Sequence, residues 1–219
     1  MPKIWEIFIS KNRFNKTLAM IKSIVLDWGG VLIDNPTPGL LHYFAEYFNT
    51  TEEKFNKAHK KYEDSFHKGT LPEDSYWEKM CNDLSKNKPV ENSLWKKAFK
   101  SAYQEKKAVF KLVSVLKKNG YKTGFLSNTE TPSMEFFHEQ KYNMFDVLVF
   151  SCKEGFRKPE KEIYEITLHR LNTRPEETLF IDDRIENIRG AESLGIHTVL
   201  FIDSEHFREK LLSFSIKIE

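Results

Sequence analysis

The stretch Ile24–Val31 reads IVLDWGGV, and it decides the fold that we expect for the rest of the chain. Its apolar, β-branched start extends back to Ile21 and is typical of a buried strand. This strand ends at Asp27, and the pair Gly29-Gly30 then indicates a tight turn. The pattern predicts an acidic side chain presented at the carboxyl end of a central strand.

Downstream of residue 104, apolar strands alternate with amphipathic helices. The predicted strands are Lys122–Ser127, Asp146–Ser151, Thr178–Asp182 and His197–Ile202. The predicted helices are Val109–Lys118, Pro132–Gln140, Glu160–Leu171, Ile185–Leu194 and Phe207–Leu212. Strands separated by helices favour right-handed βαβ units. The fold class is therefore α/β, with a doubly wound parallel sheet.

A helical segment interrupts this alternation after the first strand. Residues 38–103 carry aromatic residues at helical spacing, with breaks at Gly69 and Pro72 and again at Lys88-Pro89. We expect about four helices here, with the aromatic side chains packing between them. No residue of this segment is assigned to a site. The predicted division is an extension over residues 1–20, a core over 21–37 and 104–219, and a helical insertion over 38–103.

The composition argues against several classes of protein. In 219 residues, 34 Lys and Arg nearly balance 32 Asp and Glu, and a net charge of +2 gives no reason to expect nucleic-acid binding. Cys81 and Cys152 lie far apart, which argues against a disulfide framework or a zinc site and suits a reducing cytoplasm. No apolar run is long enough to span a membrane. We expect a soluble, cytoplasmic protein, and its oligomeric state stays open.

The first twenty residues are basic and mildly amphipathic, and they end at a second methionine, Met20. An extended start or a surface appendage is the simpler interpretation. A transit peptide is the alternative.

Polar side chains follow three of the predicted strands, and in a parallel sheet these strand ends hold the ligand. They are Asp27, the pair Ser127-Asn128 and the pair Asp182-Asp183. Neighbouring carboxylates repel one another unless a cation joins them, and hard oxygen ligands suit Mg²⁺. Ser127 and Asn128 can donate a hydroxyl and backbone N–H groups to a phosphate, and Lys158 supplies a positive charge. The set predicts phosphoryl chemistry on a small phosphorylated molecule.

Four segments, in this order and spacing, resemble the motifs of the haloacid dehalogenase superfamily. They are Ile24–Val31, Phe125–Thr129 (FLSNT), Arg157–Pro159 (RKP) and Leu179–Asn187 (LFIDDRIEN). The resemblance covers residues 21–202. It implies a Rossmann-like core with an inserted α-helical cap of the C1 type.

The resemblance also implies a role for each matching residue. Asp27 corresponds to the nucleophile that becomes an aspartyl-phosphate, and Ser127 with Asn128 to the phosphate-binding motif. Lys158 corresponds to the lysine that stabilises the nucleophile and the phosphate. Asp183 corresponds to the acid that binds Mg²⁺ most directly, and Asp182 to a further acidic ligand. Asn187 falls where many relatives place a polar residue behind the metal ligands.

One position departs from the family pattern. Phosphatases of this family usually carry a second Asp two positions after the nucleophile, as general acid and base, but Gly29 stands there. Its carbonyl can still bind Mg²⁺. General acid catalysis contributes about 10²–10⁴-fold, so a slow or leaving-group-selective enzyme is expected. The run DWGGV resembles a subgroup that includes glucose-1-phosphate phosphatase, and a glycosyl phosphate has a better leaving group.

The sequence thus predicts a Mg²⁺-dependent phosphatase that hydrolyses a small phosphate monoester, with a sugar phosphate as a candidate, through an aspartyl-phosphate. Two alternatives stay open. One is a haloacid dehalogenase-type hydrolase, which Gly29 permits but the Asp182-Asp183 pair disfavours. The other is a catalytically weak domain that binds a partner or a sugar phosphate.

Overall fold

The computed structural model describes residues 20–219, so the extension predicted for residues 1–20 lies outside the described residues except for Met20. A single parallel sheet of five strands has the order β3-β2-β1-β4-β5. The strands are β1 (Ser23–Leu26), β2 (Lys122–Ser127), β3 (Val147–Phe150), β4 (Thr178–Asp182) and β5 (His197–Leu200). The predicted α/β class is confirmed, and β1 lies at the centre of the sheet.

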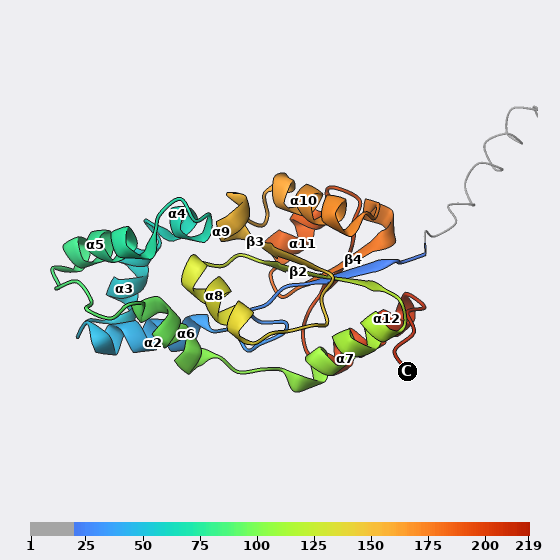
Figure 1. The fold of residues 1–219 in the computed structure, drawn as a ribbon, viewed down its shortest axis with the longest axis horizontal. Helices are drawn as coiled ribbons and strands as arrows, with labels where there is room; N and C mark the ends of the chain where they lie inside the picture. The colour runs from blue at the N-terminus through green and yellow to red at the C-terminus, as the bar shows by residue number, and fades with distance from the viewer. Residues whose placement is uncertain (1–19) are drawn as a thin grey trace, which may run out of the picture.

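Helices cover both faces of the sheet, because successive side chains of each strand alternate between two apolar clusters. Ile24 and Leu26 belong to one cluster, and Val25 between them belongs to the other. Figure 1 shows α7 (Lys107–Lys118) and α12 (Ser204–Ser213) on one side of the sheet. On the other side lie α10 (Lys161–Leu171) and α11 (Ile185–Glu192).

The insertion after β1 is helical throughout, as predicted, but it contains five helices rather than about four. They are α2 (Thr37–Tyr47), α3 (Glu52–His59), α4 (Glu63–His67), α5 (Glu73–Leu84) and α6 (Leu94–Ala102). The additional break lies between α3 and α4. There, Lys61 N–H donates to Ala58 O at 3.2 Å and Tyr62 N–H to His59 O at 2.9 Å. These short-range bonds tighten the last turn of α3 and end it without a glycine or proline.

Aromatic rings pack the insertion internally and against the core. Phe44 and Phe55 stack with centroids 4.9 Å apart, and Trp77 and Trp95 contact Phe44 at 5.1 and 5.2 Å. Helix α6 also packs on α8 (Thr131–Glu139), which follows β2. The same apolar cluster includes side chains of β1 and of the insertion, so one continuous core joins the two parts.

Two short elements were not predicted. The chain after β3 turns directly into α9 (Ser151–Glu154), so the predicted strand end at Ser151 is wrong, and Pro175–Glu177 forms a 3-10 helix before β4. The Ser151 hydroxyl is buried and donates to His67 O at 2.6 Å. That contact with the insertion gives Ser151 a role that a strand pattern does not indicate.

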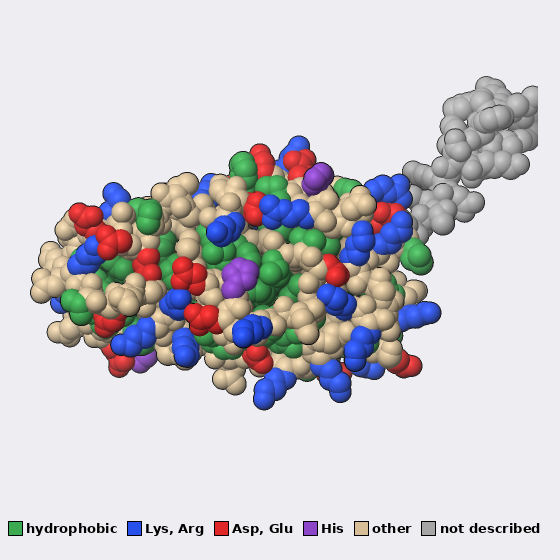
Figure 2. Space-filling view, viewed as in Figure 1, with side chains coloured by type: hydrophobic (Ala, Val, Ile, Leu, Met, Phe, Trp, Pro, Cys, Tyr) green, Lys and Arg blue, Asp and Glu red, His purple; other side chains and the backbone are tan. Residues whose placement is uncertain are grey.

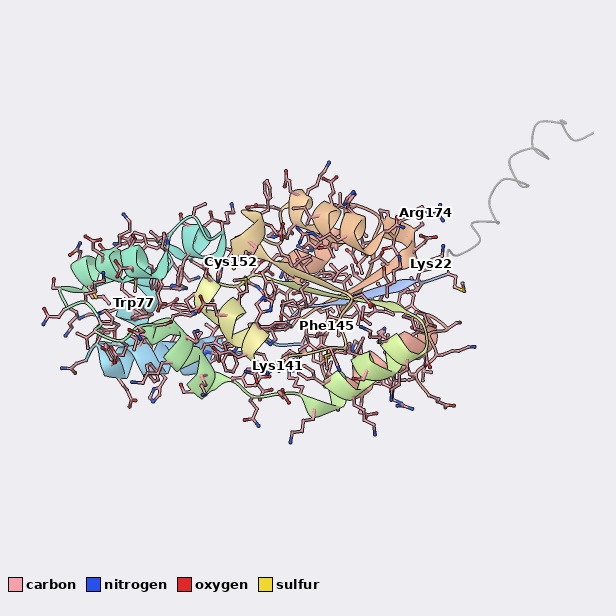
Figure 3. All side chains as sticks on the ribbon, in the orientation of Figure 1. Lys22, Trp77, Lys141, Phe145, Cys152 and Arg174 are labelled. Carbon is pink, nitrogen blue, oxygen red and sulfur yellow. The ribbon has the colours of Figure 1, made fainter. Side chains whose placement is uncertain are left out.

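The surface carries acidic and basic side chains interspersed over the face drawn in Figure 2. At the end of the sheet far from the insertion, Lys22 and Arg174 lie near each other (Figure 3), and both pair with Glu177. Trp77, by contrast, lies among the helices of the insertion (Figure 3). Among residues 20–219, no helix has the length and apolar character needed to cross a membrane.

Candidate active site

The register of the parallel strands places three functional residues at one edge of the sheet. Leu26 of β1 is level with Phe125 of β2 and with Ile181 of β4. The next residue, Asp27, donates its N–H to Ile181 O at 3.0 Å. The carboxyl ends of β1, β2 and β4 therefore converge, and with them Asp27, Ser127 and Asp182.

Lys158 joins these strand ends. It is 1% exposed, and its ammonium lies 2.7 Å from Asp27 Oδ1 and 2.7 Å from Asp182 Oδ2. It also donates to the carbonyl of Leu126 at 3.0 Å. Because an ammonium has three N–H donors, these three acceptors fix it completely. Asp27 and Lys158, both predicted to be catalytic, are in direct contact.

Asn128 holds the backbone of Lys158. Its Nδ2 donates to Lys158 O at 2.8 Å, and its Oδ1 accepts from Lys158 N–H at 2.8 Å. The side-chain amide, which the sequence placed among the phosphate-binding groups, is thus engaged in positioning the lysine. The backbone of Asn128 and the buried hydroxyl of Ser127 are the groups of this segment that remain for a phosphate.

The two adjacent acids have different surroundings. Asp182 is fully buried, and its Oδ1 accepts from Arg184 N–H at 2.9 Å while Asn187 Nδ2 lies 3.0 Å from both of its oxygens. With Lys158 on Oδ2, this carboxylate is surrounded by donors. Asp183 is only half-buried, and it lines the pocket above the strand ends.

The three acids form a site for a divalent cation. Asp27, Asp182 and Asp183 each offer one carboxylate oxygen, and these oxygens lie within 4.8 Å of one another. Burial, with Asp182 and Asp183 nearby, raises the pKa of Asp27 to about 7 although Lys158 opposes the shift. Burial and Asp182 also raise the pKa of Asp183. Three carboxylates exceed the one ammonium by two negative charges, which a hard divalent ion such as Mg²⁺ would balance.

Gly29 lines the same pocket and contributes no acid. A Cβ added to Gly29 would lie 3.2 Å from Pro36 Cδ, a short contact that a small shift of the proline ring would relieve. The proline that follows the turn therefore occupies part of the space that an aspartate side chain would need here.

A pocket of about 440 Å³ extends from these residues into the helical insertion. Its inner wall carries residues to which the sequence assigned no role, among them His67, Trp95 and Glu130. The sequence gives no signal that a single histidine in a helical segment lines the pocket.

Lys68, the next residue after His67, pairs with Glu160 at 2.6 Å. Trp28 packs against Phe99 with ring centroids 4.8 Å apart.

Comparison with known proteins agrees with this geometry. The sequence profile described as haloacid dehalogenase-like hydrolase matches residues 21–195. The chain belongs to this hydrolase family. The hydrolase fold is confirmed by a crystal structure of a HAD family enzyme from Bacteroides thetaiotaomicron, with a TM-score of 0.72 and 25% identity. That similarity covers 86% of this chain and 98% of the bacterial one. A magnesium complex of the same bacterial hydrolase matches with a TM-score of 0.66 and 26% identity, over 82% of this chain and 92% of that one.

Two curated relatives of this hydrolase differ in their extent. The D-ribitol-5-phosphate phosphatase of Bacteroides thetaiotaomicron is 27% identical over 203 residues, covering 88% of this chain and 97% of that protein. Acyl-CoA dehydrogenase family member 10 of Mus musculus is 30% identical over 189 residues, or 81% of this chain. The hydrolase chain spans only 18% of the length of that mouse protein.

Proposed function

We propose that the chain is a Mg²⁺-dependent phosphatase that hydrolyses a small phosphate monoester through an aspartyl-phosphate on Asp27. The observation that carries the proposal is the contact between the buried Lys158 ammonium and the Asp27 carboxylate, beside two further acids. A lysine held in this way keeps one carboxylate oxygen of Asp27 in place while the other is left to attack.

The reaction follows from what these residues can do. A carboxylate oxygen of Asp27 attacks phosphorus and the P–O bond to the leaving oxygen breaks; the alkoxide takes a proton from water, because Gly29 supplies no acid. A second water then attacks the acyl phosphate and frees the Asp27 carboxylate and inorganic phosphate. Ser127 and the backbone of Asn128 donate to phosphate oxygens, and Lys158 balances the negative charge. Asp27, the Gly29 carbonyl and Asp183 would hold Mg²⁺. The oxygens of Asp182 already accept hydrogen bonds from other groups, so Asp182 would contribute its negative charge beside the ion. The ion would supply neutralising positive charge at the phosphate oxygens.

We further propose a sugar or polyol phosphate as substrate. Support comes from a relative named for D-ribitol 5-phosphate and from the mixture of polar and aromatic side chains in the pocket. A panel of sugar, polyol, alkyl and terpenyl phosphates, assayed for phosphate release at equal concentration, tests this. We expect the highest kcat/KM among sugar and polyol phosphates. A preference for alkyl or terpenyl phosphates would reject this substrate class.

The two alternative functions have less support. A dehalogenase would use Asp27 without a metal, which leaves the clustered Asp182 and Asp183 unexplained. Chloride release from 2-chloropropionate would support it. A binding module would tolerate Gly29, but it has no need for an immobilised Lys158. The cytoplasm stays the proposed location, because Cys81 and Cys152 are both free thiols.

A further inference from the structure

The pocket contains a histidine nitrogen that has no partner. Among the described residues, three buried side-chain nitrogens lack a hydrogen bond: Trp28 Nε1, His67 Nδ1 and His206 Nδ1. Trp28 and His67 line the pocket, whereas His206 belongs to α12 and does not. Buried polar atoms are nearly always paired, so an unpaired atom at a pocket wall points to a group on the ligand.

The other ring nitrogen of His67 is held by the core. His67 Nε2 lies 2.7 Å from Glu130 Oε1, across the boundary between the insertion and the loop after β2. The second oxygen of Glu130 accepts from Trp95 Nε1 and from the Ser133 hydroxyl, both at 3.1 Å. Glu130, held in turn by Trp95 and Ser133, fixes both the position and the ring orientation of His67.

The charge of Glu130 decides which ring nitrogen of His67 it engages. Burial would raise the pKa of this carboxyl, but the charge and hydrogen bond of His67 outweigh it and leave the pKa lowered. An ionised carboxylate can only accept, so Nε2 carries a proton and donates to Glu130. Nδ1 is the ring nitrogen left to pair with a group of the ligand.

The neighbouring histidine differs from His67, because its Nδ1 is engaged. His59 also lines the pocket, but its Nδ1 is 2.8 Å from the hydroxyl of Tyr76. Burial lowers the pKa of His59 to about 4, so it is neutral at physiological pH. His67 is therefore the pocket histidine whose Nδ1 is free among the described residues.

The direction of the reaction places the leaving group near the insertion. Asp27 lies at the strand ends, and an in-line attack expels the alcohol on the side of phosphorus opposite to the nucleophile. That side of the pocket is walled by the insertion, including Phe44, Phe55 and His67. The alcohol is thus expected to meet both apolar rings and the free nitrogen.

We propose that His67 Nδ1 forms a hydrogen bond with a hydroxyl of the leaving alcohol and so selects polyol and sugar phosphates over alkyl phosphates. This inference rests on the proposed phosphatase function and deepens it. His67 is the specificity residue that touches substrate, and Glu130 is its positioning residue. A site built to bind a substrate hydroxyl rejects an analogue without one, because the buried nitrogen is then left unpaired.

Two substrates of equal chain length test the proposal: D-ribitol 5-phosphate and n-pentyl phosphate. In the presence of Mg²⁺, His67→Phe should lower kcat/KM for ribitol 5-phosphate by about 10- to 100-fold, the effect of one lost hydrogen bond in a buried site. The value for pentyl phosphate should change by less than about threefold, since that substrate has no hydroxyl to bind. His206→Phe, which removes an equally unpaired nitrogen outside the pocket, should change neither.

A second pair of variants guards against misfolding. His67→Phe leaves Glu130 buried without its partner, so the double variant His67→Phe/Glu130→Gln is compared with Glu130→Gln alone. The double variant should lose the preference for ribitol 5-phosphate. The single variant should retain part of it, because a glutamine can still accept from His67 Nε2 through its oxygen.

Binding separates this inference from the proposed function. Ribitol 5-phosphate and pentyl phosphate are titrated into Asp27→Asn protein and into Asp27→Asn/His67→Phe protein, with Mg²⁺ present. The expected result is a loss of affinity for ribitol 5-phosphate alone. Equal losses for both ligands, or no loss for either, would overturn the role of His67 whether or not the wild type turns over. Absence of phosphate release from any substrate by the wild type would instead reject the phosphatase function.

Discussion

Gly30 and Asp183 lie so close that the Asp183 carboxylate occupies the place where a side chain on Gly30 would begin. A Cβ added to Gly30 would fall 2.0 Å from Asp183 Oδ2. Gly30 also has a φ of +83°, a conformation that favours glycine. The second glycine of the DWGGV turn thus allows Asp183, the metal-site acid that follows β4, to reach the nucleophile loop.

The first prediction concerns Gly30→Ala. The new methyl group should displace the Asp183 carboxylate and raise the Mg²⁺ concentration needed for half-maximal activity by at least about tenfold, as loss of a well-placed ligand contact does. Gly120→Ala is the control, because Gly120 has a φ of +87° but no atom within 4 Å of its added Cβ. Both variants should lose similar stability through backbone strain. An unchanged Mg²⁺ requirement in Gly30→Ala would contradict the assignment of Asp183.

The second prediction concerns Lys158→Met. Removal of the ammonium leaves Asp27 and Asp182 buried without their shared partner, which should lower the free energy of unfolding by about 3–5 kcal/mol. Turnover should fall by at least about 10²-fold, because a charge-stabilising donor at the phosphate is lost. Urea denaturation and phosphate release measure the two effects. Lys161→Met, which removes an exposed lysine on α10, should change neither appreciably. A fully active Lys158→Met protein would exclude the proposed role.

The third prediction concerns pH. The pKa of Asp27 is raised from 3.8 to about 7 in the folded protein. Between these values the folded protein keeps a proton that the unfolded chain has lost, so the contribution of Asp27 to stability falls as pH rises and is lost above about 7. Without metal, the Tm of the wild type minus the Tm of Asp27→Asn should therefore decrease from pH 5 to pH 8.

Mg²⁺ should act in the opposite direction, because it binds the ionised carboxylates. The rise in Tm of the wild type on adding Mg²⁺ should be larger at pH 8 than at pH 5. Comparison with Asp27→Asn removes the contribution of His59, whose pKa is lowered to about 4 and which titrates over part of the same range. A rise in Tm that is independent of pH would argue against an ion at these acids.

The fourth prediction concerns Gly29→Asp. If the missing general acid limits the reaction, this variant should hydrolyse n-pentyl phosphate faster by about 10-fold or more, with a smaller gain on glucose 1-phosphate. Pro36 Cδ lies 3.2 Å from the added Cβ, so Gly29→Asp/Pro36→Ala gives the new side chain more room. No gain on pentyl phosphate in either variant would reject this explanation.

The sequence was sufficient for the sheet and for the residues at its edge. Runs of apolar residues ending at Asp27, Ser127 and Asp182 predicted three parallel strands, and their register brings these residues together. These three strand ends could be predicted because an apolar run gives way to a polar side chain at each of them, whereas the end of β3 was placed one residue too far. The division of the chain into core and insertion stays a prediction, although all five inserted helices lie between β1 and β2.

The contacts of the insertion could not be predicted in the same way. His67 and Glu130 are far apart in the sequence and meet only because α4 packs beside the loop after β2. Ser151, at the start of α9, supports this contact by donating to His67 O. The use of the Asn128 amide for the backbone of Lys158 is similar, since it depends on how two loops meet. Long-range contacts between loops carry no periodic signal.

Hydrolysis of p-nitrophenyl phosphate tests the role of Asp27 as nucleophile, because p-nitrophenolate leaves without a general acid and the missing acid at position 29 no longer limits the reaction. Wild-type protein is compared with Asp27→Asn, each with Mg²⁺ and with excess EDTA. We expect Mg²⁺-dependent release of p-nitrophenol by the wild type, and a rate at least about 10³-fold lower in Asp27→Asn. Equal rates for the two proteins would contradict the role of Asp27, and with it the proposed phosphatase.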